Sequence, residues 1–495
     1  MTDPVTEAYE LIAQGRPLDA LALLEPLGQR PDASHGQLAA YAEALKLARR
    51  DEEALAVYQR AVAVAPRSGV AEHNLAALQG DLGHHQAAEA AARRAFAKGL
   101  DAPETWLVLG RALQGQHRHD EAEAAYGEAL RRRPTMAEAH YDLAQLIWMR
   151  SEDAQAATVV LRAATRAYPD EPALAFQLAG ALRAAGDDDG AYSALLAAIA
   201  RWSEPVAPLE IAASGAAAAL KETVAAQRHA ERAVQATPDN LEATLALTDA
   251  HLGFGRAGPA SRLAEALLAK APDDQRALAR LATAWRLMDD PRYGALYDYG
   301  RFVREMTLEA PAGWPSLGTW LVDLAAALSA AHSFRAHPFG QSLRGGARAH
   351  TDPRRSDDPA VQGFFGAIEA PIQAYIVGLG EGDDPLSRRN TGARVFAGAW
   401  SIRTRPGGRQ LDHIDQPGWI SGVCWIDPLE PSPGREGWLQ LGEPGVPTQP
   451  KLGAERFIAP APGRLVLFPS YMWQGTLPLA GEADVLSIAF DLIPA

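Results

Sequence analysis

Two residues in the stretch DHIDQPGWISG, residues 412–422, have the types and the spacing of metal ligands: His413 and Asp415. The stretch has the composition of a β-strand, and residues two apart in a strand send their side chains to the same face. An imidazole and a carboxylate on one face suit two of the ligands of a non-haem iron(II) ion, which usually takes a second histidine as well. No histidine follows His413 in the chain. These residues therefore predict part of an iron site.

The elements that must position this pair change in character along the second half of the chain. Residues 318–334 and 358–380 have the apolar spacing of amphipathic helices. After residue 393 the pattern becomes short apolar runs divided by glycine and proline, which favour a β-sandwich or barrel. The runs are ARVFAGAWSIRTR, GWISGVCWIDP, GWLQLGE, GRLVLFPS and VLSIAFDL. We expect a β-domain supported by helices.

The first half repeats with a period of 34 or 35 residues, marked by one alanine in each unit. A proline ends many of the units, and the clearest unit covers residues 105–134. Small residues allow two helices to cross closely, and a proline after the second helix stops it from continuing. No unit buries its apolar face alone, so neighbouring units must stack into a superhelix with a concave surface. The marker alanines are Ala20, Ala54, Ala88, Ala122, Ala157, Ala191, Ala226 and Ala260.

These patterns resemble two known families. Residues 4–288 resemble the tetratricopeptide repeat, and residues 299–495 resemble the 2-oxoglutarate/iron(II) dioxygenase domain that is related to prolyl hydroxylases. The second resemblance is carried in order by HPFGQSLRGGARAHTD, NTGARVFAGAWSIRTRPGG, DHIDQPGWISGVCWIDP, GWLQLGEPGVPT and PGRLVLFPSYMWQGTLPLAGEADVLSIAFDL. It implies an α+β multidomain chain, with about eight repeats in an all-α superhelix (1–288) and a double-stranded β-helix, or jelly roll, with supporting helices (289–495).

The resemblance also implies iron(II) and 2-oxoglutarate as cofactors, and it assigns positions to their ligands. His413 and Asp415 match the first two iron ligands of the family. The family's distal histidine falls at Gln474, and the arginine that holds 2-oxoglutarate falls at Val485. The segment RGGARAH differs as well, because the family usually carries a Thr-Gln-Thr-like run after the two glycines. We therefore expect a degenerate site in which binding of both cofactors is in doubt.

Other residues are candidates to replace what is missing. Arg403, Arg405 and Arg464 lie on predicted strands near the site and are possible cosubstrate ligands, although arginines are more often surface charges. His350 and Asp352 form a second His-x-Asp pair in a predicted loop. Four tryptophans line a substrate pocket or fill the core, and Cys424 is expected to be a buried packing thiol. The tryptophans are Trp400, Trp419, Trp425 and Trp473.

Three functions from different classes are consistent with these patterns. The first is a scaffold that binds a protein or peptide in the repeat groove and carries an inactive oxygenase-like domain. The second is a working dioxygenase that hydroxylates a peptide or protein side chain, with Gln474 or a partner's residue completing the metal site. The third is a barrel that binds a small ligand without redox chemistry. We favour the first, which makes the β-domain a pseudoenzyme.

Composition restricts the partners and the compartment. The formal net charge of −14 argues against a nucleic acid or an anionic membrane as the general partner. The single cysteine excludes an intrachain disulfide framework, and neither a signal peptide nor a membrane span is expected, so we predict a cytoplasmic protein. The histidines His84, His85, His117 and His119 are expected to be solvated turn residues. The oligomeric state is left open.

Overall fold

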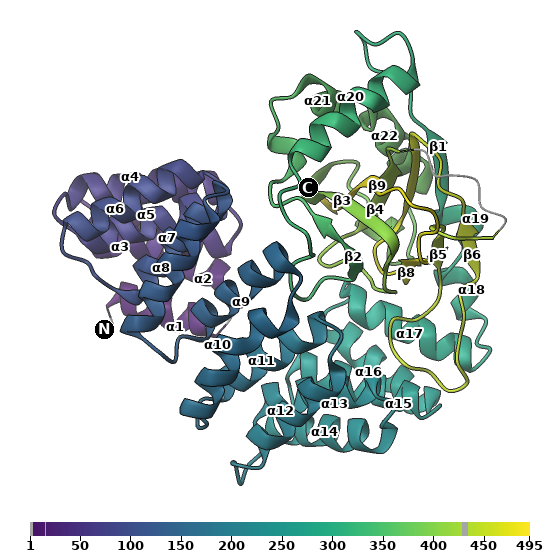
Figure 1. Ribbon diagram of the computed structural model, residues 1–495, viewed down its shortest axis with the longest axis horizontal. Helices are drawn as coiled ribbons and strands as arrows, with labels where there is room; N and C mark the ends of the chain where they lie inside the picture. The colour runs from purple at the N-terminus through teal and green to yellow at the C-terminus, as the bar shows by residue number, and fades with distance from the viewer. Residues whose placement is uncertain (1–2, 15, 428–433) are drawn as a thin grey trace. The chain divides into compact units, whose positions relative to one another are not determined.

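The 34-residue period is a succession of antiparallel helix pairs in the computed structural model, which describes residues 3–14, 16–427 and 434–495 (Figure 1). Contacts divide the chain into two compact units, Met1–Leu146 and Ile147–Ala495. The division falls within helix α9, and therefore inside the repeats. The predicted domain boundary between residues 288 and 289 stays a proposal.

The helices of the first unit pair in sequence order, and the last of them, α9, continues into the second unit. They are α1 Pro4–Ala13, α2 Pro17–Gly28, α3 His35–Leu47, α4 Asp51–Val64, α5 Gly69–Asp81, α6 His85–Ala97, α7 Pro103–Gly115, α8 His119–Arg132 and α9 Ala137–Ser151.

The second unit continues the series with α10 Ala154–Ala167, α11 Pro172–Ala184, α12 Asp188–Ile199, α13 Ala207–Ala219, α14 Thr223–Ala236, α15 Leu241–Gly253, α16 Ala257–Lys270 and α17 Gln275–Leu287. The helical half that the period predicts is therefore confirmed.

The eight marker alanines lie in the second helix of each pair, from Ala20 in α2 to Ala260 in α16. All eight are at most 2% exposed, so each sits where a larger side chain would separate two helices. In contrast, first helices of successive pairs contact one another, as α3 contacts α5 and α13 contacts α15. In a curved stack the closer layer is the inner one, so the first helices form the concave side of each unit.

Two short helices, α18 Arg292–Leu296 and α19 Tyr299–Phe302, lead from the repeats into the β-domain. The helix expected over 318–334 is α20 Leu317–Ala330, and the region 358–380 forms α21 Pro359–Ala367 and α22 Glu369–Leu379. The α20 helix begins with a capping box in which Ser316 and Thr319 bond each other's backbone amides. These helices pack with both sheets and with α17 in one core.

The β-domain contains two antiparallel sheets among the described residues, as a jelly roll requires. One has six strands in the order β1-β7-β4-β9-β3-β2 and the other three in the order β6-β5-β8. The sequence did not predict the short strands β1, β2, β6 and β8. The strands are β1 Arg304–Thr307, β2 Leu343–Arg348, β3 Arg394–Gln410, β4 Ile420–Trp425, β5 Leu439–Leu441, β6 Arg456–Ile458, β7 Arg464–Pro469, β8 Gln474–Thr476 and β9 Val485–Pro494.

Inside the second unit, the end of α9 is bonded to the segment that precedes β2. The Trp148 indole donates to the His337 carbonyl at 2.9 Å and packs edge-on against the His337 ring. The Met149 carbonyl accepts from the backbone amides of Arg335 and Ala336 at 2.8 and 3.1 Å. An ion pair joins Glu152, just beyond α9, to Arg405 of β3.

A second set of contacts joins α15 and α17 to the other side of the β-domain. The Trp473 indole donates to Thr283 of α17 at 2.9 Å, and both side chains are buried. Arg286 of α17 donates to the Gly442 carbonyl at 2.8 Å, and the Leu252 carbonyl of α15 accepts from the Gln449 amide at 3.1 Å. The β-domain is therefore bonded to first helices of the repeats at both ends of this unit, close to the C-terminal ends of those helices.

No helix in the described part of the chain combines the length and the apolar character needed to cross a membrane.

Candidate functional site

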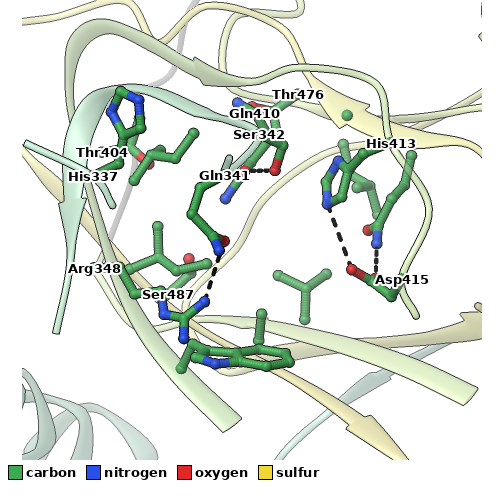
Figure 2. Close-up of a pocket in the computed structure, with 18 of the residues that line it drawn as sticks. His337, Gln341, Ser342, Arg348, Thr404, Gln410, His413, Asp415, Thr476 and Ser487 are labelled. Carbon is green, nitrogen blue, oxygen red and sulfur yellow. Dashed lines mark hydrogen bonds and ion pairs between the residues drawn. The ribbon is translucent and has the colours of Figure 1, made fainter. Parts of the chain in front are cut away.

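A cavity of about 450 Å³ lies between the two sheets of the β-domain. Strands β3, β4 and β9 of the larger sheet form one wall, and β5 and β8 of the smaller sheet contribute Leu439 and Gln474 to the other. Figure 2 shows the side chains that point into this space. His413, Asp415, Gln474 and Val485 all line it, so the four positions singled out in the sequence meet in one place.

The β-strand predicted around His413 and Asp415 is wrong. The two residues lie in the connection between β3 and β4, where only His413 forms a bridge, with Gln474. The His413 amide donates to the Gln474 carbonyl at 2.8 Å, and the Gln474 amide donates to the His413 carbonyl at 2.9 Å. Pro417 follows closely and has no amide hydrogen to extend the ladder, which explains why the pairing stops.

His413 and Asp415 nevertheless face each other (Figure 2). The His413 Nδ1 donates to the Leu411 carbonyl at 2.7 Å, so in the neutral ring Nε2 carries the lone pair. Nε2 lies 3.7 Å from Asp415 Oδ1, and the two side chains are 29% and 21% exposed. A backbone bond to the far ring nitrogen is the usual support of a metal-binding histidine.

Gln474, which the sequence resemblance aligns with the third metal ligand, is bonded to Asp415. Its side-chain amide nitrogen donates to Asp415 Oδ2, and the Ser421 hydroxyl lies 3.0 Å from the same oxygen. A neutral amide is a weak ligand for iron(II). The described residues contain no group of three histidine, cysteine or acidic side chains able to hold a metal. These residues do not complete the set of two histidines and one carboxylate.

A second carboxyl group lies behind Asp415. Asp491 is 3% exposed, and its Oδ1 lies 2.7 Å from the Ser421 hydroxyl. Burial, and next the negative charge of Asp415, raise the pKa of Asp491 well above its ordinary value. Two carboxyl groups therefore lie at this end of the cavity, and the raised pKa favours the protonated form of Asp491.

Val485 begins β9 and lines the cavity opposite Thr404 of β3. Its side chain offers neither a charge nor a hydrogen bond, so it gives a dicarboxylate no anchor. Val485 and Gln474, which the sequence resemblance aligns with the cosubstrate arginine and the distal histidine, therefore do not fit 2-oxoglutarate and iron(II).

None of the three arginines proposed from the sequence lines the cavity. Arg403 donates to the Ser329 carbonyl at 3.2 Å, and Arg405 pairs with Glu152. Both flank Thr404, which points inward, so the alternation of the strand sends them outward. Arg464 donates to the Ala459 carbonyl at 2.7 Å.

A different arginine enters the cavity: Arg348, at the end of β2. Its guanidinium lies 4.9 Å from the ring centre of Trp400 and donates to Gln341 Oε1 at 3.2 Å (Figure 2). Sequence reasoning missed this residue because β2 was not predicted. The signal was the departure of RGGARAH from the family's pattern, since Arg348 is the central residue of the altered run.

The remaining candidates divide between the cavity and the core. Trp400 and Trp425 line the cavity, whereas Trp419 donates to the Leu386 carbonyl and Trp473 to Thr283. Cys424 is fully buried, and burial raises the pKa of its thiol. Asp352 caps the short helix Pro353–Arg355 and pairs with Arg354, and neither it nor His350 lines the cavity.

Two family models match the chain. Residues 398–491 match "Putative 2OG-Fe(II) oxygenase" and residues 107–172 match "Tetratricopeptide repeat". No curated protein matches the chain.

Several solved structures are similar to part of the chain. A tetratricopeptide repeat protein from Parabacteroides merdae ATCC 43184 is 17% identical over 49% of this chain and 96% of that chain, with a TM-score of 0.35. MamA from Desulfovibrio magneticus RS-1 is 17% identical over 34% of this chain and 96% of that chain, with a TM-score of 0.29. PilF from Pseudomonas aeruginosa is 17% identical over 42% of this chain and 94% of that chain, with a TM-score of 0.30.

The match at residues 107–172 falls on the helix pairs α7 to α10, and the match at residues 398–491 falls on the strands that form the cavity, so the chain contains a tetratricopeptide-repeat segment and, after it, a segment that matches the 2OG-Fe(II) oxygenase model.

Proposed function

We propose that this protein is a scaffold that binds a protein or peptide through its repeats and that its oxygenase-like domain has lost iron and 2-oxoglutarate chemistry. One observation carries the proposal: the amide nitrogen of Gln474 donates to Asp415 at the place where a third metal ligand is required. An N–H group that points at the carboxylate presents a hydrogen, not a lone pair, to the space that iron would occupy.

The cosubstrate position supports the same conclusion independently. Val485 leaves a dicarboxylate without a cation on β9, and Arg403, Arg405 and Arg464 are all engaged outside the cavity. An enzyme that lacked either the distal histidine or the cosubstrate arginine could still work with a modified site. Without both, neither iron(II) nor 2-oxoglutarate has its usual protein ligand.

The partner binds on the concave side of the Met1–Leu146 unit. In the Ile147–Ala495 unit, the inner helices α9, α15 and α17 are bonded to the chain's own β-domain. The inner helices α1, α3, α5 and α7 of the first unit form the same kind of layer. Solenoid repeats commonly bind extended segments on this surface.

A working dioxygenase is the second candidate, and one observation favours it. The bond from His413 Nδ1 to Leu411 orients Nε2 as a metal ligand would be oriented. In this case a residue of the bound partner, or Gln474 through its carbonyl oxygen, completes the site and the enzyme hydroxylates a peptide or protein side chain.

Elemental analysis of the full chain, purified without air and with iron(II) supplied, tests the proposal. We expect less than one iron per chain and no turnover of 2-oxoglutarate, and His413→Ala should leave both values and the melting temperature unchanged. One iron per chain that is lost in His413→Ala, together with 2-oxoglutarate turnover, would establish the dioxygenase instead.

A further inference from the structure

Arg348 is the one arginine or lysine among the described residues that line the cavity. It has no acidic partner there. Histidines apart, the cavity wall contains no other positive side chain. In the described part of the chain, no carboxylate lies within ion-pair distance of this guanidinium, whose hydrogen-bond partner is the neutral Gln341. Asp352 and Asp491 act on its charge only through space. A cation held without a counter-ion inside a protein cavity is costly unless an anion binds to it.

The surroundings of Arg348 fix its orientation. The Trp400 ring lies beneath its guanidinium at 4.9 Å, and Gln341 holds one of its amino groups. Burial lowers the pKa of Arg348 to about 10, so the side chain stays positive at neutral pH. A planar guanidinium that is stacked on one face keeps its remaining N–H groups for a ligand, and it binds carboxylates with two parallel bonds.

The strand register places Arg348 in the same part of the cavity as Val485, which is aligned with the family's cosubstrate arginine but has no charge. Arg348 is paired with Ile402 of β3, and Ile402 with Ser487 of β9. Directly opposed residues share a face of the sheet, so these three side chains form one row along the floor of the cavity. Two strand spacings separate β2 from β9, about 10 Å, which is a distance that a small organic molecule bridges. Ser487 offers a hydroxyl within the same row.

The opposite end of the cavity carries the Asp415 carboxylate. Figure 2 shows Arg348 on one side and the His413–Asp415 pair on the other. Asp415 Oδ2 accepts from Gln474, and Asp491 lies behind it, bonded to the same Ser421 hydroxyl. Without a metal, a second carboxylate at this end would meet like charge, whereas a hydroxyl, amide or ammonium group would donate to Asp415 Oδ1.

We propose that the cavity binds, without a metal, a small organic molecule with one carboxylate, held by Arg348, and a hydrogen-bond donor at its far end, held by Asp415. This inference rests on the proposed function. If no metal binds, Asp415 faces the cavity as a free carboxylate, and the small molecule must then present a carboxylate at one end only. It assigns the β-domain the part of a sensor for a monocarboxylate instead of that of a 2-oxoglutarate enzyme.

Calorimetric titration of the full chain in EDTA tests this with three acids of the same chain length. 5-Aminopentanoate has a carboxylate and an ammonium, pentanoate a carboxylate and a methyl group, and glutarate two carboxylates. We expect 5-aminopentanoate to bind tightest, pentanoate more weakly and glutarate weakest. Arg348→Met should weaken the binding of 5-aminopentanoate by about 10- to 100-fold, the value of a charge-assisted pair.

Three further variants separate a binding role from a structural one. Arg403→Met, on the outer face of the neighbouring strand, should leave the affinities unchanged. Arg348→Lys keeps the charge and should retain a measurable part of the affinity, with the melting temperature as the check on folding. Asp415→Asn should remove the preference for 5-aminopentanoate over pentanoate while both still bind.

The outcomes distinguish this inference from the proposed function. If none of the three acids binds, or if Arg348→Met binds them as the unaltered chain does, the inference is wrong and the scaffold proposal stands. In a second arm of the experiment, iron(II) replaces EDTA and 2-oxoglutarate is titrated into the full chain. If a dicarboxylate binds only in that arm, both the inference and the loss of iron chemistry are refuted.

Discussion

Gln474 connects three parts of the site by itself. Its backbone forms the bridge to His413, its side chain donates to Asp415, and it begins strand β8. The residue that replaces the expected ligand is thus integrated in the structure, and it holds the Asp415 carboxylate in one orientation. A histidine at this position would change the chemistry of the site without changing the backbone that carries it.

Gln474→His tests the metal position. The change supplies the missing imidazole next to His413 and Asp415, so iron(II) affinity should increase by about tenfold or more, the scale on which metal sites respond to altered ligand sets. Removing His413 from this variant should abolish the gain. Iron binding is measured by anaerobic titration, and an unchanged affinity would show that the pair is not oriented for metal.

Adding Val485→Arg tests the cosubstrate position. We expect 2-oxoglutarate to increase iron binding strongly in the double variant and weakly in either single variant, because each anchor holds only one end of the complex. The measurement is iron affinity with and without 2-oxoglutarate. Equal effects in the single and double variants would contradict this coupling of the two positions.

At the residue scale, the sequence predicted which side chains meet but not the full set. His413, Asp415, Gln474 and Val485 could be placed because short motifs and their order survive in the sequence. Arg348 could not be placed by the same means. It lies on a six-residue strand with a register shift between Arg344 and Gly346, and its position depends on pairing with β3, more than fifty residues away.

At the scale of single elements, the helices were the predictable part. A period of 34 or 35 residues over eight units is a local signal, and each unit repeats the same requirement for a small residue. The unpredicted strands are different. β1, β6 and β8 have only three or four residues, and the six residues of β2, LRGGAR, include two glycines, which are depleted in strands. The connection from His413 to Pro417 was misread as a strand for a related reason: its composition is β-like, while its backbone pairs at one point only.

The buried alanines allow a direct test on one helix. Ala122 of α8 is 0% exposed, whereas Ala124 on the same helix is exposed. Ala122→Leu should lower the free energy of unfolding by about 1–3 kcal/mol, because the added atoms force the packed helices apart. Ala124→Leu, the matched control, should change it by less than about 0.5 kcal/mol. Denaturant unfolding measures both, and similar losses would place Ala122 outside the helix contact.

The contact between α9 and the segment before β2 should respond to acid. His337 is 2% exposed, and burial, then the nearby Arg344, lower its pKa from 6.5 to about 4, with Glu152 and Arg405 acting in opposite directions. The unfolded chain therefore binds a proton that the folded chain excludes. The contribution of neutral His337 to the free energy of unfolding is fully present above pH 6.5. It is lost as the pH falls toward 4, by up to ~1.4 kcal/mol per pH unit.

His337→Asn should remove this contribution. The variant loses the ring contact with Trp148 and should be less stable at pH 7, but its stability should change less between pH 6.5 and 4 than that of the unaltered chain. His84→Asn, at the start of α6, is the control and should keep the original slope. Denaturant unfolding at several pH values measures the slopes, and equal slopes in all three proteins would disprove the assignment.

At the scale of the whole molecule, the sequence boundary and the packing boundary differ. Periodicity ends near residue 288, yet Leu278 and Ala282 of α17 belong to the same core as the sheets. A sequence period reports where a motif stops repeating and contains no information on which repeats pack against another domain. Those contacts join residues far apart in the chain: 190 positions separate Thr283 from Trp473, and 253 separate Glu152 from Arg405.

Two fragments test which boundary governs folding. Residues 135–495 contain all of α9 and the rest of the second unit, and should unfold in one cooperative transition. Residues 289–495 lose the partners of Trp473 and His337, and should be poorly soluble or melt well below the longer fragment. Near-ultraviolet circular dichroism and thermal unfolding compare them. Equal melting temperatures would support independent folding from residue 289.

The two anchors of the β-domain also constrain how the chain can vary among related proteins. The domain is bonded at Trp148 on one side and at Leu252 and Thr283 on the other, so the helices between these points span a fixed distance. Duplication or deletion of a repeat between α9 and α17 would separate one anchor from its partner. Repeats before α9 carry no such requirement, so relatives should differ in repeat number there and keep a constant number between the anchors.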